Sequence, residues 1–113
     1  MAQVIIKDCP EYSLNLITDT MEKGMEVLGV WEKYISPGMK VLLKVNLIGP
    51  KTSDTAAITH AEFVRALVRI LKERGCIVWI GDSSGGAIGG VAPTARSMVV
   101  SGLEKVAREE GAV

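Results

Sequence analysis

The chain has few of the residues that hold metals and redox cofactors. Among its 113 residues are two cysteines and one histidine, and aromatic side chains account for only 4%. Cys9 and Cys76 are far apart and stand in no ligand spacing, whereas zinc sites and iron–sulfur clusters need three or four nitrogen or sulfur ligands. We therefore expect this chain to bind no metal and no cofactor by itself.

The chain also lacks an excess of either charge and any long apolar run. Its 13 basic side chains balance its 13 acidic ones without a basic block, so we expect no nucleic acid as a partner. No apolar run approaches the roughly 20 residues that cross a bilayer. The amino terminus turns polar at Lys7 and Asp8, too soon for a secretion signal. We therefore expect a cytoplasmic protein that does not enter a membrane.

What the sequence does contain is an alternation of two apolar periods. With 48% hydrophobic residues it can bury a core, and its length suits a single domain over residues 1–113. The apolar period changes repeatedly between about 2 and about 3.5, which is typical of alternating strands and helices. The pattern predicts strands over residues 3–7, 40–46 and 76–80, and helices over residues 13–35, 59–74, 94–100 and 101–111.

This order of elements predicts a three-layer αβα domain with a small, mostly parallel sheet. The last predicted helix ends at Gly111, and the apolar residues Ala112 and Val113 have the character of a fourth strand. We therefore expect an incomplete, Rossmann-like doubly wound domain that is a fragment of a longer protein. A sheet edge left open in this way would favour a homo-oligomer.

The segment that follows the third predicted strand is the most informative part of the chain. The strand ends at Gly81, and an acid, two hydroxyls and two pairs of glycines come next. Open α/β sheets form their ligand crevices at such strand ends. The loop lacks the G-x-G-x-x-G spacing, and its Walker-like glycine spacing lacks the lysine that must follow. The alternative is that the acid only caps a turn and the glycines only allow positive φ. The ligand-binding candidates here are Asp82, Ser83, Ser84, Gly85 and Gly86.

The second predicted strand ends in a cation and an amide. Lys44 and Asn46 are two residues apart and therefore point to the same side of the strand. A lysine at the end of a buried strand is costly unless it reaches a partner or a crevice. Lys44 would thus bind an anion or pair with Asp82, and the alternative is that it reaches solvent while Asn46 bonds the following loop.

The single histidine lies at the start of the helix predicted over residues 59–74, directly after a long loop over residues 47–58. The sequence from Thr59 to Glu62 fits a capping box, which predicts Thr59 as the helix cap and makes it a further ligand-binding candidate. His60 is a candidate for proton transfer or ligand contact, against the alternative of an ordinary polar surface residue. Lys44, His60 and Asp82 are therefore the catalytic candidates, and the sequence leaves open whether the chain is an enzyme.

Several short segments, taken in order, resemble one family. They are Tyr12 after the first strand, Pro37-Gly38, Val41 to Leu47, Thr59-His60, Gly81-Asp82-Ser83 and Ser101-Gly102-Leu103. Through them nearly the whole chain resembles the domain-of-unknown-function family 362, whose usual pattern has proline where Val45 and Ala61 stand here. The resemblance implies an unassigned activity. It also implies longer members with a ferredoxin-type cluster segment, labelled iron–sulfur proteins, and this chain has none of those cysteines.

Two hypotheses of function follow. In the first, the strand ends form a half-site for a small anionic ligand or cofactor. Lys44 supplies charge, Asn46 and Ser83 supply hydrogen bonds, Asp82 orients Lys44 or binds a cation, and His60 transfers a proton. In the second, the chain is a non-catalytic scaffold or interaction module of a redox protein, which dimerises or packs on downstream residues. The sequence does not identify a substrate or a reaction for the first.

Overall fold

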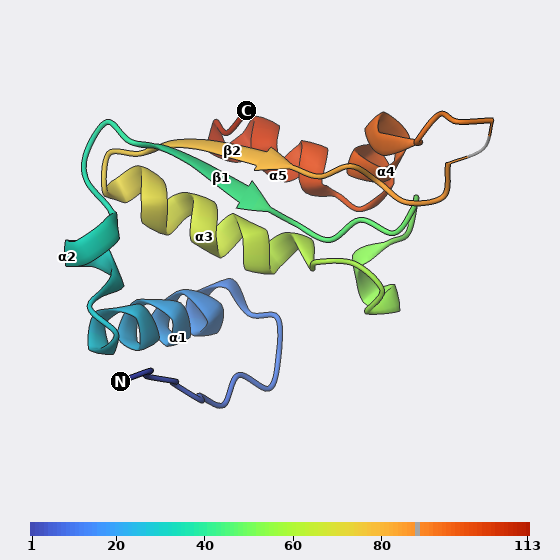
Figure 1. Cartoon of the computed structure of the whole chain (residues 1–113). Coiled ribbons are helices and arrows are strands. Elements are labelled where there is room, and N and C mark those ends of the chain that lie inside the picture. Colours follow the sequence, from blue (N-terminus) through green and yellow to red (C-terminus); the bar gives the residue numbers. More distant parts are fainter. Residues whose placement is uncertain (88) are drawn as a thin grey trace.

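The computed structural model describes residues 1–87 and 89–113, and its centre is a pair of parallel strands (Figure 1). Strand β1 (Lys40–Lys44) pairs with β2 (Ile77–Gly81), with Leu42 opposite Trp79. Side chains alternate between the two faces of a strand, so Val78 and Ile80 point together into the core and are buried. A helix joins the two strands, as parallel pairing requires.

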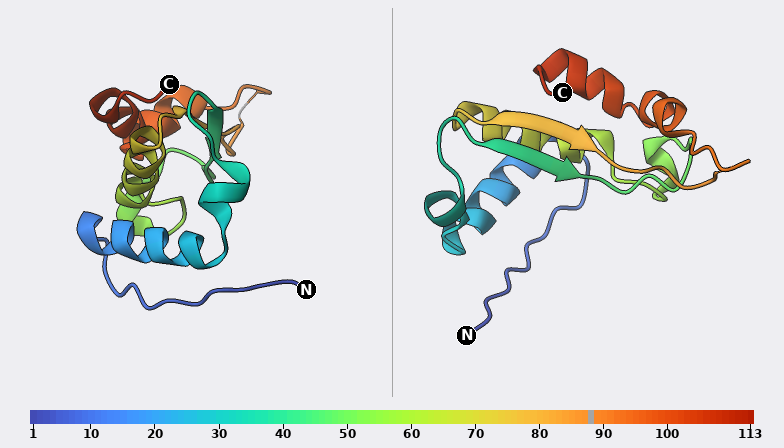
Figure 2. Two further views of the ribbon diagram at one scale, coloured as in Figure 1. Left: turned by 90° about the vertical axis from the view of Figure 1, so that its left-hand side faces the viewer. Right: turned by 45° about the horizontal axis from the view of Figure 1, so that its top comes forward.

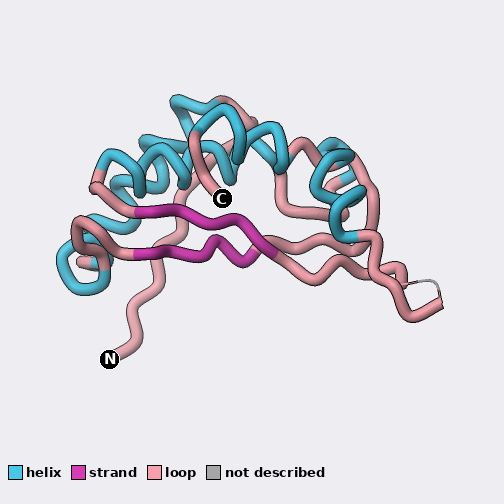
Figure 3. Tube along the Cα trace, turned by 90° about the horizontal axis from the view of Figure 1, so that it is seen from above, coloured by secondary structure: helices cyan, strands magenta, loops and turns pink. Residues whose placement is uncertain are grey.

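The helices gather on one face of this sheet. Helix α3 (Ala61–Glu73) connects the strands, and α5 (Leu103–Glu110) lies beside it. Their apolar sides meet β2 in one cluster, whose buried members include Val64, Val68, Leu71, Leu103 and Val106. Helix α1 (Leu14–Val27) packs on the other flank of α3, and Figures 2 and 3 show this row of helices along one side of the strands.

The predicted small α/β domain with a parallel sheet is confirmed. The third layer of the predicted sandwich is not among the residues that the structure describes. On the face away from α3, Leu42 is 62% exposed and Trp79 is 44% exposed, because no helix of the described residues covers that side of the sheet. Consecutive β–α–β units that progress in one direction place their helices on the same face, and α3 and α5 follow that rule.

The strand predicted over residues 3–7 is absent, and that prediction was wrong. These residues are extended without strand pairing, and the side chains of Ile5 and Lys7 lie against Gly24 of α1. Gly24 presents no side chain, so the segment packs on the helix surface instead of pairing with β1.

The helix predicted over residues 13–35 is two helices. It breaks at Gly29, whose φ of 67° is left-handed, and α2 (Val30–Tyr34) starts a new direction. A left-handed residue cannot continue an α-helix, and glycine adopts that conformation at no steric cost.

The later helices follow the prediction closely. Helix α4 (Thr94–Val100) has the predicted bounds, and a short 3₁₀ helix, η1 (Ser53–Thr55), lies within the loop predicted over residues 47–58. Gly102 occupies the N-cap of α5, one residue after the predicted start of this helix, and its φ of 83° suits glycine. The Ser101 hydroxyl still accepts a hydrogen bond from the main chain of Leu103, at 3.3 Å.

The last residue joins the sheet. The N–H of Val113 donates to the carbonyl of Val78 at 2.9 Å, and the N–H of Ile80 donates to the carbonyl of Val113 at 2.8 Å. These two bonds have the form of parallel pairing on the edge of β2 away from β1. None of the helices in the described residues combines the length and the apolar character needed to cross a membrane.

Candidate functional site

An ion pair joins the carboxyl ends of the two strands. The Nζ of Lys44 lies 2.5 Å from Oδ1 of Asp82, and the same Nζ donates to the carbonyl of Val45 at 2.6 Å. The Asp82 side chain is 8% exposed, whereas that of Lys44 is 65% exposed. Among the alternatives that the sequence allowed for Lys44, the structure therefore contains the ion pair, with the lysine still open to solvent.

Asp82 also holds main-chain groups. Its Oδ2 accepts from the N–H of Leu47 at 2.7 Å, and its Oδ1 accepts from the N–H of Ser83 at 2.8 Å. The hydrogen bond from Lys44 lowers the pKa of Asp82 most; burial acts in the opposite direction, and the two N–H groups add to the lowering. Asp82 is therefore ionised at neutral pH, and it fastens the segment after β1 to the segment after β2.

Asn46 and Thr59 bind each other rather than the ion pair. The Thr59 hydroxyl accepts from the main-chain N–H of Asn46 at 2.9 Å, and the Thr59 N–H donates to the Asn46 carbonyl at 3.1 Å. The Asn46 side-chain amide donates to the carbonyl of Ala57 at 3.3 Å. These bonds close the loop over residues 47–58, and Thr59 is therefore not the cap of α3, contrary to the capping-box prediction.

His60 is the cap of α3. Its Nδ1 accepts from the main-chain N–H of Glu62 at 3.1 Å, which leaves the proton of the neutral ring on Nε2. The imidazole stacks on the ring of Tyr12, with centroids 3.6 Å apart and planes 7° from parallel. Within the described residues, no hydrogen bond or ion pair connects His60 with Lys44 or Asp82.

The two serines after Asp82 differ in burial and in hydrogen bonding. Ser84 is buried at 4% exposure; its hydroxyl lies 2.7 Å from that of Ser97, and its N–H donates to the Thr94 hydroxyl at 3.2 Å. Ser84 therefore anchors the loop to α4, whereas Ser83 is exposed. The sequence pattern did not identify Thr94 and Ser97 as hydrogen-bond partners of Ser84. A hydroxyl near the start of a short helix does not indicate which distant residue it will contact.

Gly85 and Gly86 are glycines for different structural reasons. A side chain on Gly85 would place its Cβ 2.7 Å from the carbonyl oxygen of Ile48, closer than atoms tolerate. The N–H of Gly85 donates to the carbonyl of Leu47 at 2.8 Å, so the loop runs tightly beside the segment after β1. Gly86 has a φ of 77°, a left-handed value that favours glycine.

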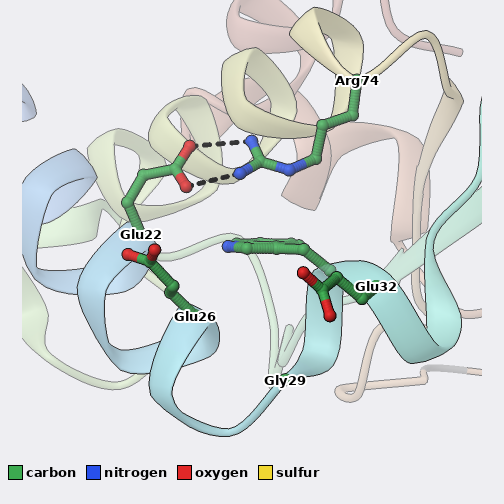
Figure 4. A pocket seen from close by; sticks show the side chains of 6 residues that line it. Glu22, Glu26, Gly29, Glu32 and Arg74 are labelled. Atoms are coloured by element: carbon green, nitrogen blue, oxygen red, sulfur yellow. Dashed lines mark hydrogen bonds and ion pairs between the residues drawn. The ribbon is translucent and has the colours of Figure 1, made fainter.

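A separate cavity of about 410 Å³ lies where α1, α2 and the end of α3 meet (Figure 4). Arg74 binds both carboxylate oxygens of Glu22, at 2.8 and 2.6 Å, and its guanidinium lies 4.1 Å from the centre of the Trp31 ring. The carboxylates of Glu26 and Glu32 also line it. Arg74 thus links the end of α3 to α1 through its ion pair with Glu22. No motif in the sequence indicated this cavity.

The donor atoms of the chain do not fit an iron–sulfur cluster. Cys9 is exposed in the amino-terminal segment, and Cys76 is buried, with its thiol donating to the carbonyl of Ser36. A cluster needs about four thiolate ligands, and the described residues contain no group of three or more His, Cys, Asp or Glu side chains placed to hold a metal.

Comparisons with known proteins agree with the resemblance seen in the sequence. Residues 41–113 match the family described as Domain of unknown function (DUF362). Over 72 residues the chain is 32% identical to a thylakoid-associated protein of Synechocystis sp.; the match takes in 64% of this chain and 22% of that protein. The chain thus spans about a fifth of that relative's length, and no solved structure matches it. The resemblance is confirmed, and the chain belongs to the DUF362 family.

Proposed function

We propose that the carboxyl edge of the sheet binds a small anionic ligand. We call this edge the rim and define it by Lys44, Asn46, Asp82 and Ser83. The observation that carries the proposal is the asymmetry of the ion pair, in which a largely buried Asp82 holds an ammonium group whose side chain is 65% exposed. An ammonium group that Asp82 and Val45 hold in place, on a side chain open to solvent, can donate its third N–H to an incoming carboxylate or phosphate oxygen.

The charge state of the rim suits such a ligand. Because the pKa of Asp82 is lowered, chiefly by Lys44, the carboxylate stays ionised and the ammonium group stays positioned. Lys44 uses two hydrogen bonds, to Asp82 and to Val45, and an ammonium group has three N–H donors. The exposed hydroxyl of Ser83 and the second N–H of the Asn46 side-chain amide, whose first N–H donates to Ala57, are further donors for an anion.

The loop that carries half of the rim is held before any ligand arrives. The Ser84–Ser97 contact and the bond from Gly85 to Leu47 attach it to α4 and to the neighbouring segment. A site that is already ordered loses less conformational entropy on binding, which favours affinity for a small ligand. The proposal is for binding, and His60 enters it only as a neighbour at the start of α3 whose Nδ1 is already used as a cap.

Titration of the isotope-labelled chain with inorganic phosphate and with succinate tests the proposal. We expect saturable amide shifts confined to residues 44–47 and 82–86. The change Lys44→Met should abolish them, Lys44→Arg should retain them, and Lys40→Met, at the opposite end of β1, should leave them unchanged. Shifts that never saturate, or that Lys40→Met reduces as much as Lys44→Met, would refute an anion site at the rim.

The alternative of a scaffold or interaction module of a redox protein rests on a different observation. It is the sheet face that no helix of the described residues covers, on which Leu42 and Trp79 are exposed. Lys44 of the rim points to the same side of β1, so a partner docked on this face would compete with a ligand at the rim.

A further inference from the structure

The main-chain N–H groups of the glycine-rich loop are already bonded within the chain. Three successive N–H groups, those of Ser83, Ser84 and Gly85, donate to an aspartate carboxylate, a threonine hydroxyl and a main-chain carbonyl, at 2.8, 3.2 and 2.8 Å respectively. Loops that bind phosphate depend on several free N–H groups that converge on the anion. The part of this loop next to Lys44 therefore does not have the donors of a phosphate-binding loop.

The N–H groups on the other side of the rim are used in the same way. Those of Asn46 and Leu47 donate to a threonine hydroxyl and to the Asp82 carboxylate, at 2.9 and 2.7 Å. At the start of α3, the N–H groups of Ala61 and Glu62 donate to a serine hydroxyl and to a histidine ring nitrogen, both at 3.1 Å. A ligand at the rim would therefore be held by side-chain donors, in contrast to the main-chain donors of a phosphate-binding loop.

The charges of the rim cancel. Lys44 carries one positive charge and Asp82 one negative charge, and Asn46 and Ser83 are neutral, so the sum is zero. The attraction of an anion to a charged site grows in proportion to the charge of the anion, whereas the free energy of removing water from the anion grows with the square of that charge. A site with no net charge gains little from a second negative charge on its ligand and still has to desolvate it. The rim therefore favours an anion with a single charge.

The side-chain donors of the rim suit a carboxylate. They are the third N–H of the Lys44 ammonium group, the Ser83 hydroxyl and the second N–H of the Asn46 amide. A carboxylate presents two oxygens that together carry one charge, whereas a phosphate monoester presents three oxygens that carry nearly two. Three donors, of which one is charged, are enough for the first and too few for the second.

We propose that the ligand of the rim is a monocarboxylate and that the rim discriminates against phosphate monoesters. This inference rests on the proposed anion site and adds the chemical class of its ligand. The carboxylate binds the Lys44 ammonium group, and the ionised Asp82 beside that group repels a second negative charge on the same ligand.

Titration of the isotope-labelled chain with acetate, methyl phosphate and dimethyl phosphate at pH 7.5 tests the inference. At this pH methyl phosphate carries close to two negative charges, and the other two anions carry one. The ionic strength is kept equal, because salt screens exposed charges. From the amide shifts of residues 44–47 and 82–86, we expect acetate and dimethyl phosphate each to bind about threefold more tightly than methyl phosphate.

A matched pair of variants tests whether the balance of charge sets this preference. Ser83→Lys adds a positive charge to the rim and keeps the main-chain N–H that donates to Asp82. It should raise the affinity for methyl phosphate about threefold more than the affinity for acetate. The control Ser83→Gln lengthens the same exposed side chain without a charge and should leave the preference unchanged.

The outcomes distinguish this inference from the anion site on which it rests. If none of the three anions gives saturable shifts, the anion site is refuted and the ligand class with it. If the shifts saturate but methyl phosphate binds as tightly as acetate, the ligand class is wrong and the anion site stands. The same holds if Ser83→Lys and Ser83→Gln show the same preference.

Discussion

The carboxylate of Asp82, directly after β2, accepts a 2.7 Å hydrogen bond from the main-chain N–H of Leu47, three residues after β1. This bond continues the contact between the two chain segments beyond the last strand pair, Lys44 and Gly81. The most polar residue of the glycine-rich loop is thus a structural link as well as a part of the rim. Its removal should therefore affect stability and binding together.

Asp82→Asn should lower the free energy of unfolding by about 1–3 kcal/mol, because a buried acceptor of main-chain N–H groups loses its charge and one of its oxygens. Urea denaturation at pH 7 measures the change. Asp54→Asn, at an exposed aspartate in η1, is the control and should change stability by less than about 0.5 kcal/mol. Equal effects of the two substitutions would contradict a structural role for Asp82.

Gly85→Ala should destabilise the loop, because the new Cβ would lie 2.7 Å from the carbonyl oxygen of Ile48 and the main chain would have to move. Overpacking of this kind costs about 1–3 kcal/mol. The matched control is Gly49→Ala, where a Cβ meets nothing within 4 Å. Thermal unfolding compares the two variants, and a Gly85→Ala protein as stable as the Gly49→Ala protein would show that the close approach is absent.

Because of Glu110, the free energy of unfolding should depend on pH in the acid range. It accepts hydrogen bonds from Arg69 at 2.8 Å and from Arg65 at 2.6 Å, and these contacts, Arg69 first, lower its pKa from 4.5 to about 2 against the effect of burial. A carboxylate with a lowered pKa stabilises the folded state above its ordinary pKa. That contribution disappears as the pH falls from about 4.5 to about 2.

Glu110→Gln should therefore cost about 1–2 kcal/mol at pH 7, where solvent at the half-exposed Arg69 screens part of the interaction. The difference from the unsubstituted chain should shrink below pH 4.5. Denaturant unfolding at a series of pH values measures it. Glu104→Gln, which breaks an exposed pair with Arg108, should show a smaller difference. A Glu110→Gln difference that is constant from pH 7 to pH 2 would contradict the linkage.

His60→Ala should lower the free energy of unfolding by about 1 kcal/mol, because the N–H of Glu62 loses its acceptor at the start of α3. His60→Asn should restore most of that loss, since asparagine is a good N-cap. Neither change should alter anion binding at the rim, because no hydrogen bond or ion pair in the described residues links His60 with Lys44 or Asp82. A loss of phosphate shifts in His60→Asn would instead place this residue in the binding site.

The position of the candidate site followed from local patterns in the sequence. Strand β1 has a run of valine and leucine and β2 a run of isoleucine and valine, and each run ends at a polar residue. Parallel strands joined by a helix bring their carboxyl ends to one edge, so Lys44 and Asp82 were expected to be neighbours. This inference depends only on the strand ends and not on contacts elsewhere in the chain, and the ion pair between Lys44 and Asp82 agrees with it.

The roles of the neighbouring residues depend on contacts between distant parts of the chain. The sequence placed Thr59 and His60 correctly at a helix start but chose the wrong cap, because the Thr59 hydroxyl is occupied by Asn46. Ser84 had the same pattern as Ser83, and only its contact with Ser97 on α4 makes it an anchor. Such competition between hydrogen-bond partners cannot be deduced from spacing.

The sequence by itself determined the two strands and the longer helices after residue 40, the parallel character of the sheet and the polar character of the rim, because periodicity and turn residues act over a few positions. The tertiary structure decided that residues 3–7 lie on α1 rather than in the sheet, and that α3 and α5 share one face while Leu42 and Trp79 stay open on the other. Those outcomes depend on which apolar surfaces meet in space, and packing between distant segments alone selects among them.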